Sequence, residues 1–283
     1  MKIFPEKSDS LKEIFNTSKP IIGMIHLKPL PGSPHYDGQS LDKVIDFALK
    51  EVDAYLEGGV DGLIIENAWD LPFLKPEKIG YETVAAMSYI TKPIIEKSDL
   101  PVGINILANG VIPSLAVAKA TGADFVRVNQ WVNAYVANEG FVEGKAGEAL
   151  RYRSNIKGDD IKIFADVHVK HGSHSIVADR SIEEQTRDAI WFNADVLIAT
   201  GERTGDETEI TEINKIKNNS NLPVITGSGL TGDNVEKILT NAHGSIVGSW
   251  LKEDGCWWKP VDVDRVKKLM NKVKKVRKEL NEK

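Results

Sequence analysis

Short apolar runs alternate with longer amphipathic segments along almost the whole chain. Three of the apolar runs begin with a small residue and an aspartate, followed by β-branched residues, and three others begin at a proline, which fits the first position of a strand. The runs are apolar at consecutive positions, which is typical of strands buried on both faces of a parallel sheet. The pattern predicts eight strands, within residues 19–26, 60–67, 100–107, 123–129, 160–169, 194–200, 222–228 and 244–250.

The segments between these runs have helical spacing. Residues 41–56 carry apolar side chains at 41, 44, 45, 48, 49, 52 and 56, and Ser40 is a suitable N-cap residue. Alternating strands and helices predict a parallel sheet covered by helices, and eight such units favour a closed (β/α)8 TIM barrel. A doubly wound open sheet is the alternative, but no G-x-G-x-x-G motif follows the first strand.

We expect a single domain, with residues 1–18 as an N-terminal cap segment and residues 19–283 as the barrel. The segment SLKEIF within the cap predicts a short helix that closes the bottom of the barrel. The segments at 26–38 and 129–153 are too long for simple connectors. The aromatic residues and glycines of the second segment suit a lid or an oligomer contact, and we expect a homo-oligomer.

Composition narrows the choice of function. The net charge of −5 gives no sign of nucleic-acid binding, and one cysteine excludes an internal disulfide and a multi-cysteine zinc site. We expect a cytoplasmic protein, because the first residues lack an apolar signal-peptide core and no run approaches the ~20 apolar residues of a membrane span. The basic amphipathic segment from about residue 262 is interpreted as the last barrel helix, and peripheral membrane contact through it is the alternative.

Polar side chains stand at the ends of the predicted strands. The carboxyl ends of barrel strands carry the chemistry in this fold, because eight loops converge there. The candidate catalytic residues selected in this way are Glu66, Asn105, Arg127, Asn129, Asp166, His168 and Lys170, and His26 ends the first strand.

Two strands show the alternation that directs these side chains inward. Asp166, His168 and Lys170 occupy every second position and should share one face, as should Arg127 and Asn129. The intervening residues are apolar and should face the helices. The cluster is interpreted as a functional site, and a salt-bridge network that fills the barrel is the alternative.

A divalent metal ion is a further hypothesis for this cluster. Glu66, Asp166, His168 and His26 offer the carboxylate and imidazole groups that bind such ions. No short metal motif is present, and these ligands would come from different strands.

Glycine-rich segments follow the seventh and eighth strands. Gly227, Ser228 and Gly229 precede a helix, and Gly248 and Ser249 follow the last strand. Loops after strands seven and eight form the recurrent phosphate site of these barrels, so the five residues predict a phosphate-binding site. An ordinary glycine-rich turn is the alternative.

Several stretches together resemble the BtpA/SgcQ family over nearly the whole chain: IGMIHLKPLPGSP, DGLIIEN, GINILANG, FVRVNQWV, EGFVEGKAGEALRYR, FADVHVKH, ATGERTG and PVITGSGL. The resemblance implies a TIM barrel related to phosphate-binding barrels. One class of members is linked to photosystem I assembly as a peripheral thylakoid protein, and another group sits among sugar-utilisation genes. The resemblance carries over no catalytic residues.

Two hypotheses for function follow. The first is an enzyme acting on a small phosphorylated substrate, such as a sugar or nucleoside phosphate, as an isomerase, lyase or hydrolase. Asp166 and Glu66 would be acid–base groups or metal ligands, His168 a proton carrier, and Arg127 and Lys170 would stabilise negative charge. The second is a non-catalytic assembly or stability factor for a membrane complex.

Overall fold

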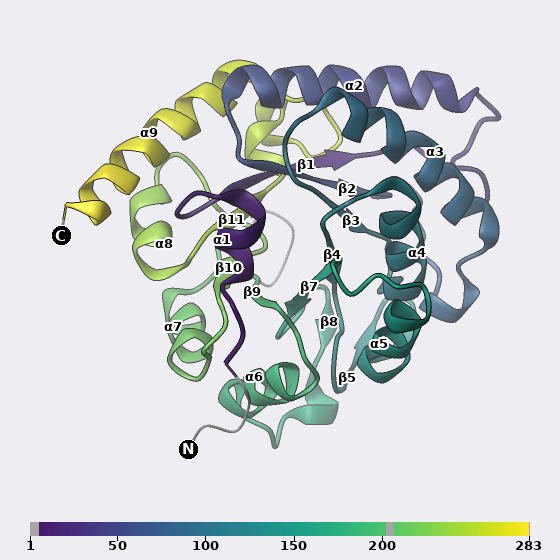
Figure 1. Cartoon of the computed structure of the whole chain (residues 1–283). Helices are drawn as coiled ribbons and strands as arrows, with labels where there is room; N and C mark the ends of the chain where they lie inside the picture. The colour runs from purple at the N-terminus through teal and green to yellow at the C-terminus, as the bar shows by residue number, and fades with distance from the viewer. Residues whose placement is uncertain (1–5, 202–206, 283) are drawn as a thin grey trace.

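The computed structural model describes residues 6–201 and 207–282 and shows a closed barrel of eight parallel strands (Figure 1). The strands pair in the order in which they occur along the chain, and the last pairs with the first. The predicted TIM barrel is therefore confirmed, and each barrel strand lies within one of the eight predicted runs. The barrel strands are β1 (Ile21–His26), β2 (Gly62–Glu66), β3 (Val102–Asn105), β4 (Phe125–Val128), β7 (Lys162–Asp166), β9 (Val196–Ala199), β10 (Val224–Thr226) and β11 (Ser245–Val247).

Helices surround the barrel in Figure 1. The predicted helix from residue 41 is confirmed, with Ser40 Oγ accepting a hydrogen bond from the Asp42 backbone amide at 3.2 Å. The C-terminal helix packs against both α2 and α8 and so closes the outer ring. The helices are α1 (Ser10–Phe15), α2 (Leu41–Gly58), α3 (Tyr81–Lys97), α4 (Val111–Thr121), α5 (Ala146–Asn155), α6 (Ile182–Trp191), α7 (Ile210–Asn218), α8 (Val235–Asn241) and α9 (Val263–Asn281).

The barrel strands separate two apolar cores. The larger core lies between strands and helices and includes Val126 and Val128, whereas the smaller lies inside the barrel and includes Phe125 and Phe164. The predicted alternation along β4 therefore holds. The two phenylalanine rings stack with centroids 4.3 Å apart. Gly103 makes room for them, because a Cβ there would lie 2.1 Å from the Phe125 ring.

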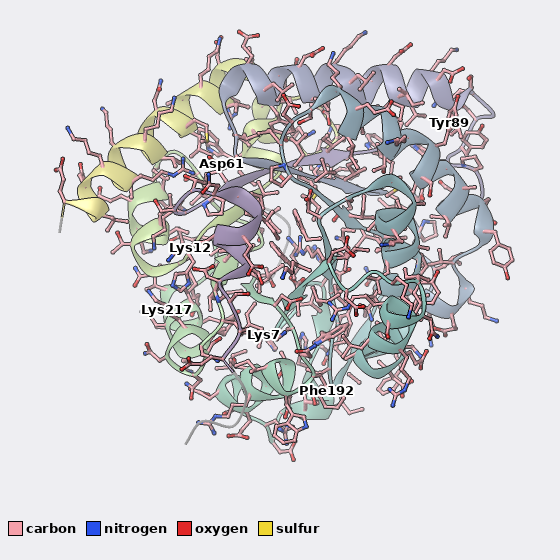
Figure 2. The ribbon with its side chains drawn as sticks, in the orientation of Figure 1. Lys7, Lys12, Asp61, Tyr89, Phe192 and Lys217 are labelled. Atoms are coloured by element: carbon pink, nitrogen blue, oxygen red, sulfur yellow. The ribbon has the colours of Figure 1, made fainter. Side chains whose placement is uncertain are left out.

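The predicted helix SLKEIF is α1, and it covers the amino-terminal end of the barrel. Leu11 and Phe15 belong to the inner core, and the Phe15 ring meets the Phe125 ring edge-on at 5.9 Å. Lys7 (Figure 2) ties the preceding segment to the barrel, since its Nζ lies 2.8 Å from Asp195 Oδ1. Residues 1–5 of the predicted cap, residues 202–205 of the stretch ATGERTG and residue 283 lie outside the described residues.

The recurring aspartate before a strand has a structural role. Asp61 Oδ2 accepts from the Ile21 backbone amide, and Asp124 Oδ2 accepts from that of Val102, each at 2.8 Å. Asp195 Oδ2 accepts from the Ile163 amide at the same distance. Each aspartate thus satisfies a backbone donor at or next to the start of the neighbouring barrel strand, which would otherwise be buried without a partner.

The long segment after β4 forms a small sheet that the sequence did not predict. Strands β5 (Ala134–Ala137) and β6 (Gly140–Glu143) make an antiparallel hairpin, and β8 (Gly172–Ser173) joins the free edge of β5. The segments that follow β4 and β7 are therefore joined by backbone hydrogen bonds on one side of the barrel mouth.

Candidate functional site

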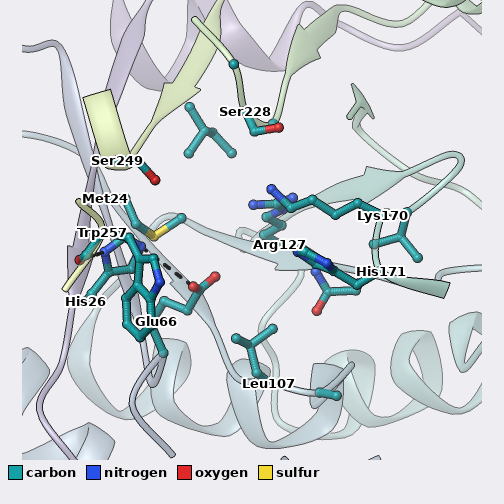
Figure 3. A pocket seen from close by; sticks show the side chains of 18 of the residues that line it. Met24, His26, Glu66, Leu107, Arg127, Lys170, His171, Ser228, Ser249 and Trp257 are labelled. Atoms are coloured by element: carbon teal, nitrogen blue, oxygen red, sulfur yellow. Dashed lines mark hydrogen bonds and ion pairs between the residues drawn. The ribbon is translucent and has the colours of Figure 1, made fainter. Parts of the chain in front are cut away.

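A cavity of about 520 Å³ opens at the carboxyl ends of the barrel strands (Figure 3). Figure 3 shows His26, Glu66 and Trp257 on one side of it and Arg127 and Lys170 on the other, with Ser228 and Ser249 at one end. This volume suits a whole small organic molecule. Of the predicted site residues, the cavity is lined by His26, Glu66, Arg127, Asn129, Lys170, Gly227, Ser228, Gly229, Gly248 and Ser249.

Three predicted residues meet in register on adjacent strands. His26 on β1 pairs with Glu66 on β2, and Glu66 pairs with Asn105 on β3. Asn105 Nδ2 donates to Glu66 Oε2 at 2.6 Å, so Asn105 fixes the position of one carboxyl oxygen. The other oxygen, Oε1, lies 3.9 Å from His26 Nε2. The space between these two atoms suits a ligand hydroxyl group in contact with both.

Burial changes the protonation of both groups. It raises the pKa of Glu66, an effect that nearby Arg127 and the Asn105 hydrogen bond partly oppose. Burial, reinforced by the charge of Lys252, lowers the pKa of His26 well below its usual range. The His26 ring is therefore neutral, and its Nδ1–H donates to the Trp257 carbonyl at 3.0 Å. Nε2 is then left as an acceptor beside a carboxyl group that binds a proton readily.

Arg127 and Asp166 form a buried pair between β4 and β7. Arg127 donates from Nε to Asp166 Oδ1 at 3.2 Å and from Nη2 to Oδ2 at 3.0 Å. Burial opposes the charge on Arg127, but the Asp166 carboxylate raises the pKa of Arg127 above its usual value. Asn129 Nδ2 also donates to Asp166 at 3.5 Å, while the buried Asn129 Oδ1 has no hydrogen-bond partner among the described residues. Asp166 does not line the cavity; it orients Arg127, which does.

The two glycine-rich segments line the cavity with backbone that leaves little room for side chains. A Cβ on Gly227 would lie 2.9 Å from Arg127 Nη2 and 2.7 Å from Thr200 Cγ2, so a side chain at 227 would crowd the pocket. A Cβ on Gly248 would lie 3.3 Å from His26 Cε1. Gly229 has φ of +77°, which favours glycine. Backbone from both segments can therefore approach a ligand more closely than side chains would allow.

The structure separates His168 from the rest of the predicted site. Strand β7 ends at Asp166, so the alternation that predicted a shared face stops there. His168 lies instead in a second cavity, where its ring and that of His174 have centroids 3.8 Å apart. Burial lowers the pKa of His168 to about 4. Lys170 lines the main cavity, but from the loop and not from the strand.

The four predicted metal ligands are not brought together. Asp166 directs both carboxylate oxygens to Arg127, and His168 lies in the second cavity. Within residues 6–201 and 207–282, no group of three or more His, Cys, Asp or Glu side chains has a geometry that could hold a metal ion. The residues therefore do not fit a metal centre built from Glu66, Asp166, His168 and His26.

The structure adds residues that the sequence pattern did not select. Trp257 lines the cavity beside His26, although it lies in the irregular segment after β11. The paired tryptophans of the stretch GCWWKP were the available signal. Tyr135 of β5 and Leu107 after β3 also line the cavity, but neither differs in sequence from an ordinary core residue.

None of the helices in the described part of the chain combines the length and the apolar character that crossing a membrane requires. The apolar side of α9, where Val266, Leu269 and Val273 are buried, packs on the barrel. The interpretation of this segment as the last barrel helix is confirmed.

Comparison with known proteins places this architecture in a family. The model of the BtpA family matches residues 17–275. A protein of Methanocaldococcus jannaschii without a described function is 41% identical over 260 residues, covering 92% of this chain and 97% of that protein. The photosystem I biogenesis protein BtpA of Synechocystis is 37% identical over 258 residues, covering 90% of this chain and 88% of that protein.

Solved structures share the barrel at low sequence identity. Thiamine phosphate pyrophosphorylase from Pyrococcus furiosus superposes with a TM-score of 0.54 at 15% identity, covering 91% of this chain and 96% of that chain. At this level of identity the likeness supports the fold alone.

Proposed function

The chain belongs to the BtpA family, and we propose that it is an enzyme that acts on a small phosphorylated substrate. The observation that carries the proposal is the cavity in which Arg127 and Lys170 face His26 and Glu66, with the two glycine-rich segments at one end. A phosphate group would bind backbone amides and serine hydroxyls of 227–229 and 248–249, at the position where barrels of this type bind phosphate. The fold likeness to an enzyme whose name includes a phosphate compound is consistent with this proposal.

The acid–base chemistry would be carried by Glu66 and His26. A substrate hydroxyl between Glu66 Oε1 and His26 Nε2 could pass its proton to the neutral His26 ring and accept a proton from Glu66, whose pKa is raised by burial. Arg127, held by Asp166, and Lys170 would stabilise negative charge that develops on a substrate oxygen. Isomerase, lyase and hydrolase chemistry all use such a set.

Binding of phosphate tests the proposal directly. We expect inorganic phosphate and ribose 5-phosphate to raise the melting temperature of the wild-type protein, because a ligand that binds only the folded state stabilises it. Gly248→Ala should reduce this stabilisation, since the added methyl group would lie 3.3 Å from His26 Cε1 and narrow the glycine-rich end of the cavity. Gly147→Ala on α5 is the matched control, because a Cβ there would meet only the Arg151 side chain at 3.5 Å. A wild-type protein unaffected by either compound would contradict the proposal.

A role in the assembly of a membrane complex is the second candidate. The observation in its favour is the 37% identity to the photosystem I biogenesis protein of Synechocystis. Co-purification of this chain with a membrane complex, unchanged by Glu66→Gln and without any response to phosphate compounds, would favour this role over catalysis. We also propose, from the sequence alone, that the protein is cytoplasmic and forms a homo-oligomer.

A further inference from the structure

The cavity has two unlike ends. Figure 3 shows Ser228 and Ser249 at one end and Leu107 at the opposite end, with Glu66 and Arg127 between them. Near Leu107 the lining is apolar, and we call Leu71, Pro72, Phe73, Leu107 and Ala108 the apolar end. The two loops that supply it are fastened together, because Leu107 N donates to Asn67 Oδ1 at 2.7 Å and Ala108 N donates to the Leu74 carbonyl at 3.4 Å.

Trp257 forms a flat wall beside this cavity, and aromatic neighbours fix its position. Its ring meets those of His26 and Trp258 edge-on, with centroids 5.7 and 5.9 Å away, and that of Trp69 at a tilt at 5.2 Å. The backbone of the same residue is held by the His26 hydrogen bond. A ligand would therefore meet an indole whose orientation is already set, which lowers the entropic cost of binding.

A phosphate group alone leaves most of the cavity unused. The volume of about 520 Å³ extends from the glycine-rich segments to the apolar end. The hydroxyl groups of a sugar would face Leu71, Pro72 and Leu107, whose side chains cannot form hydrogen bonds, so the sugar would gain little from this end of the cavity. Phe73, Tyr135, Trp250 and Trp257 add aromatic rings to the same lining, from the loop after β2, from β5 and from the segment after β11.

We infer that the substrate carries a flat aromatic or heteroaromatic ring, which binds beside Trp257 at the apolar end while its phosphate group occupies the glycine-rich end. This inference rests on the proposed function and narrows its substrate class from phosphorylated small molecules in general to aryl or heteroaryl phosphates. Flat rings pack favourably on indole in offset or edge-on geometry, whereas a saturated ring of equal size lacks that interaction.

Two probes that differ mainly in ring planarity test the inference. Calorimetric titration of the wild-type protein should give phenyl phosphate a Kd about tenfold lower than cyclohexyl phosphate, a ratio that corresponds to about 1.4 kcal/mol. Ribose 5-phosphate should also bind about tenfold more weakly than phenyl phosphate. Equal affinity for the phenyl and cyclohexyl compounds would overturn the inference.

Paired tryptophan variants locate the ring. Trp257→Leu should lower the affinity for phenyl phosphate about tenfold and leave the affinity for inorganic phosphate unchanged, because leucine keeps an apolar surface but removes the ring. Trp191→Leu on α6 is the control, because Trp191 is 61% exposed and does not line the cavity. An unchanged affinity for phenyl phosphate in Trp257→Leu would contradict the assignment of this wall.

The same measurements separate the inference from the proposed function. If Gly248→Ala weakens the binding of inorganic phosphate and ribose 5-phosphate, but phenyl phosphate binds no more tightly than cyclohexyl phosphate, the inference fails and the proposed function stands. If none of the four compounds binds, the proposed function fails and the inference fails with it.

Discussion

Arg127 and Asp166 bind each other through two hydrogen bonds across β4 and β7, and only Arg127 of the two lines the cavity. The aspartate, which the sequence suggested as an acid or base, is thus a positioning residue. Its carboxylate fixes the plane of the guanidinium and compensates its buried charge.

Asp166→Asn should therefore weaken both fold and ligand binding. Asparagine leaves the buried guanidinium without a negative partner, so we expect the free energy of unfolding to fall by about 3 kcal/mol in urea titrations. The double variant Arg127→Met with Asp166→Leu should recover most of that stability without recovering phosphate binding. A single variant as stable as the wild type would show that the pair does not support the barrel.

Gly227→Ala should damage the cavity with a smaller effect on the barrel. The added methyl group would lie 2.9 Å from Arg127 Nη2, so the guanidinium must shift. We expect phosphate affinity to fall at least tenfold and the free energy of unfolding to fall by about 1–3 kcal/mol. Calorimetry with inorganic phosphate and urea unfolding measure the two effects, and unchanged phosphate affinity would contradict the close approach of this backbone.

His168→Gln should change acid stability and leave the main cavity intact. Burial lowers the pKa of His168 to about 4 from a usual 6.5. The unfolded chain therefore takes up this proton first, and stability is lost as the pH falls from 6.5 toward 4. The free energy of unfolding of the variant, measured in urea, should fall less than that of the wild type between pH 6.5 and pH 4. Phosphate should stabilise the variant as much as the wild type. Loss of phosphate binding in His168→Gln would contradict the placement of this residue outside the main cavity.

Glu212 lines the same second cavity and should give stability the opposite dependence on pH, which Glu212→Gln should remove. Burial raises the pKa of Glu212 to about 7 from 4.5, and its Oε1 has no hydrogen-bond partner among the described residues. The folded protein keeps this proton longer than the unfolded chain does, so stability falls as the pH rises from 4.5 to 7. We expect the free energy of unfolding of the variant, measured in urea across this pH range, to decline less steeply than that of the wild type. An unchanged slope would mean that Glu212 titrates normally.

Lys252→Met should destabilise the segment that carries Trp257. Lys252 Nζ lies 2.6 and 2.7 Å from the two Glu51 carboxyl oxygens, and both side chains are buried. Removal of one member of a buried pair costs about 3–5 kcal/mol, whereas replacement of both by apolar residues is often tolerated. Urea unfolding of Lys252→Met, compared with Glu51→Leu plus Lys252→Met, measures the difference. Equal stability of the two variants would argue against the pair as the anchor.

The fold could be predicted from the sequence because its signals are local and repeated. The eight apolar runs each contain a barrel strand, and positions such as Val126 and Phe125 alternate between the two cores as a strand requires. Arg127 and Glu66 were placed correctly at the cavity by the same rule, since both lie within strands. Prediction of these positions needs only the period of a strand and the geometry of a barrel.

The parts that were missed depend on irregular backbone. His168 lies two residues beyond the end of β7, where the strand period no longer applies. Trp257 lies in a segment after β11 that folds back on itself through a bridge between Lys252 and Val261, and Lys252 is held by Glu51, 201 positions away in the sequence. The hairpin of β5 and β6 has exposed and buried positions of mixed character, with Val136 46% and Phe141 41% exposed, so its pattern resembles a loop.

Phe15 and Leu11 close the barrel floor, and this closure has a kinetic consequence. Among the described residues, a ligand would therefore reach the cavity from the carboxyl ends of the strands. Under the proposed function, a product that keeps its phosphate would occupy the same glycine-rich segments as the substrate, and it should behave as a competitive inhibitor.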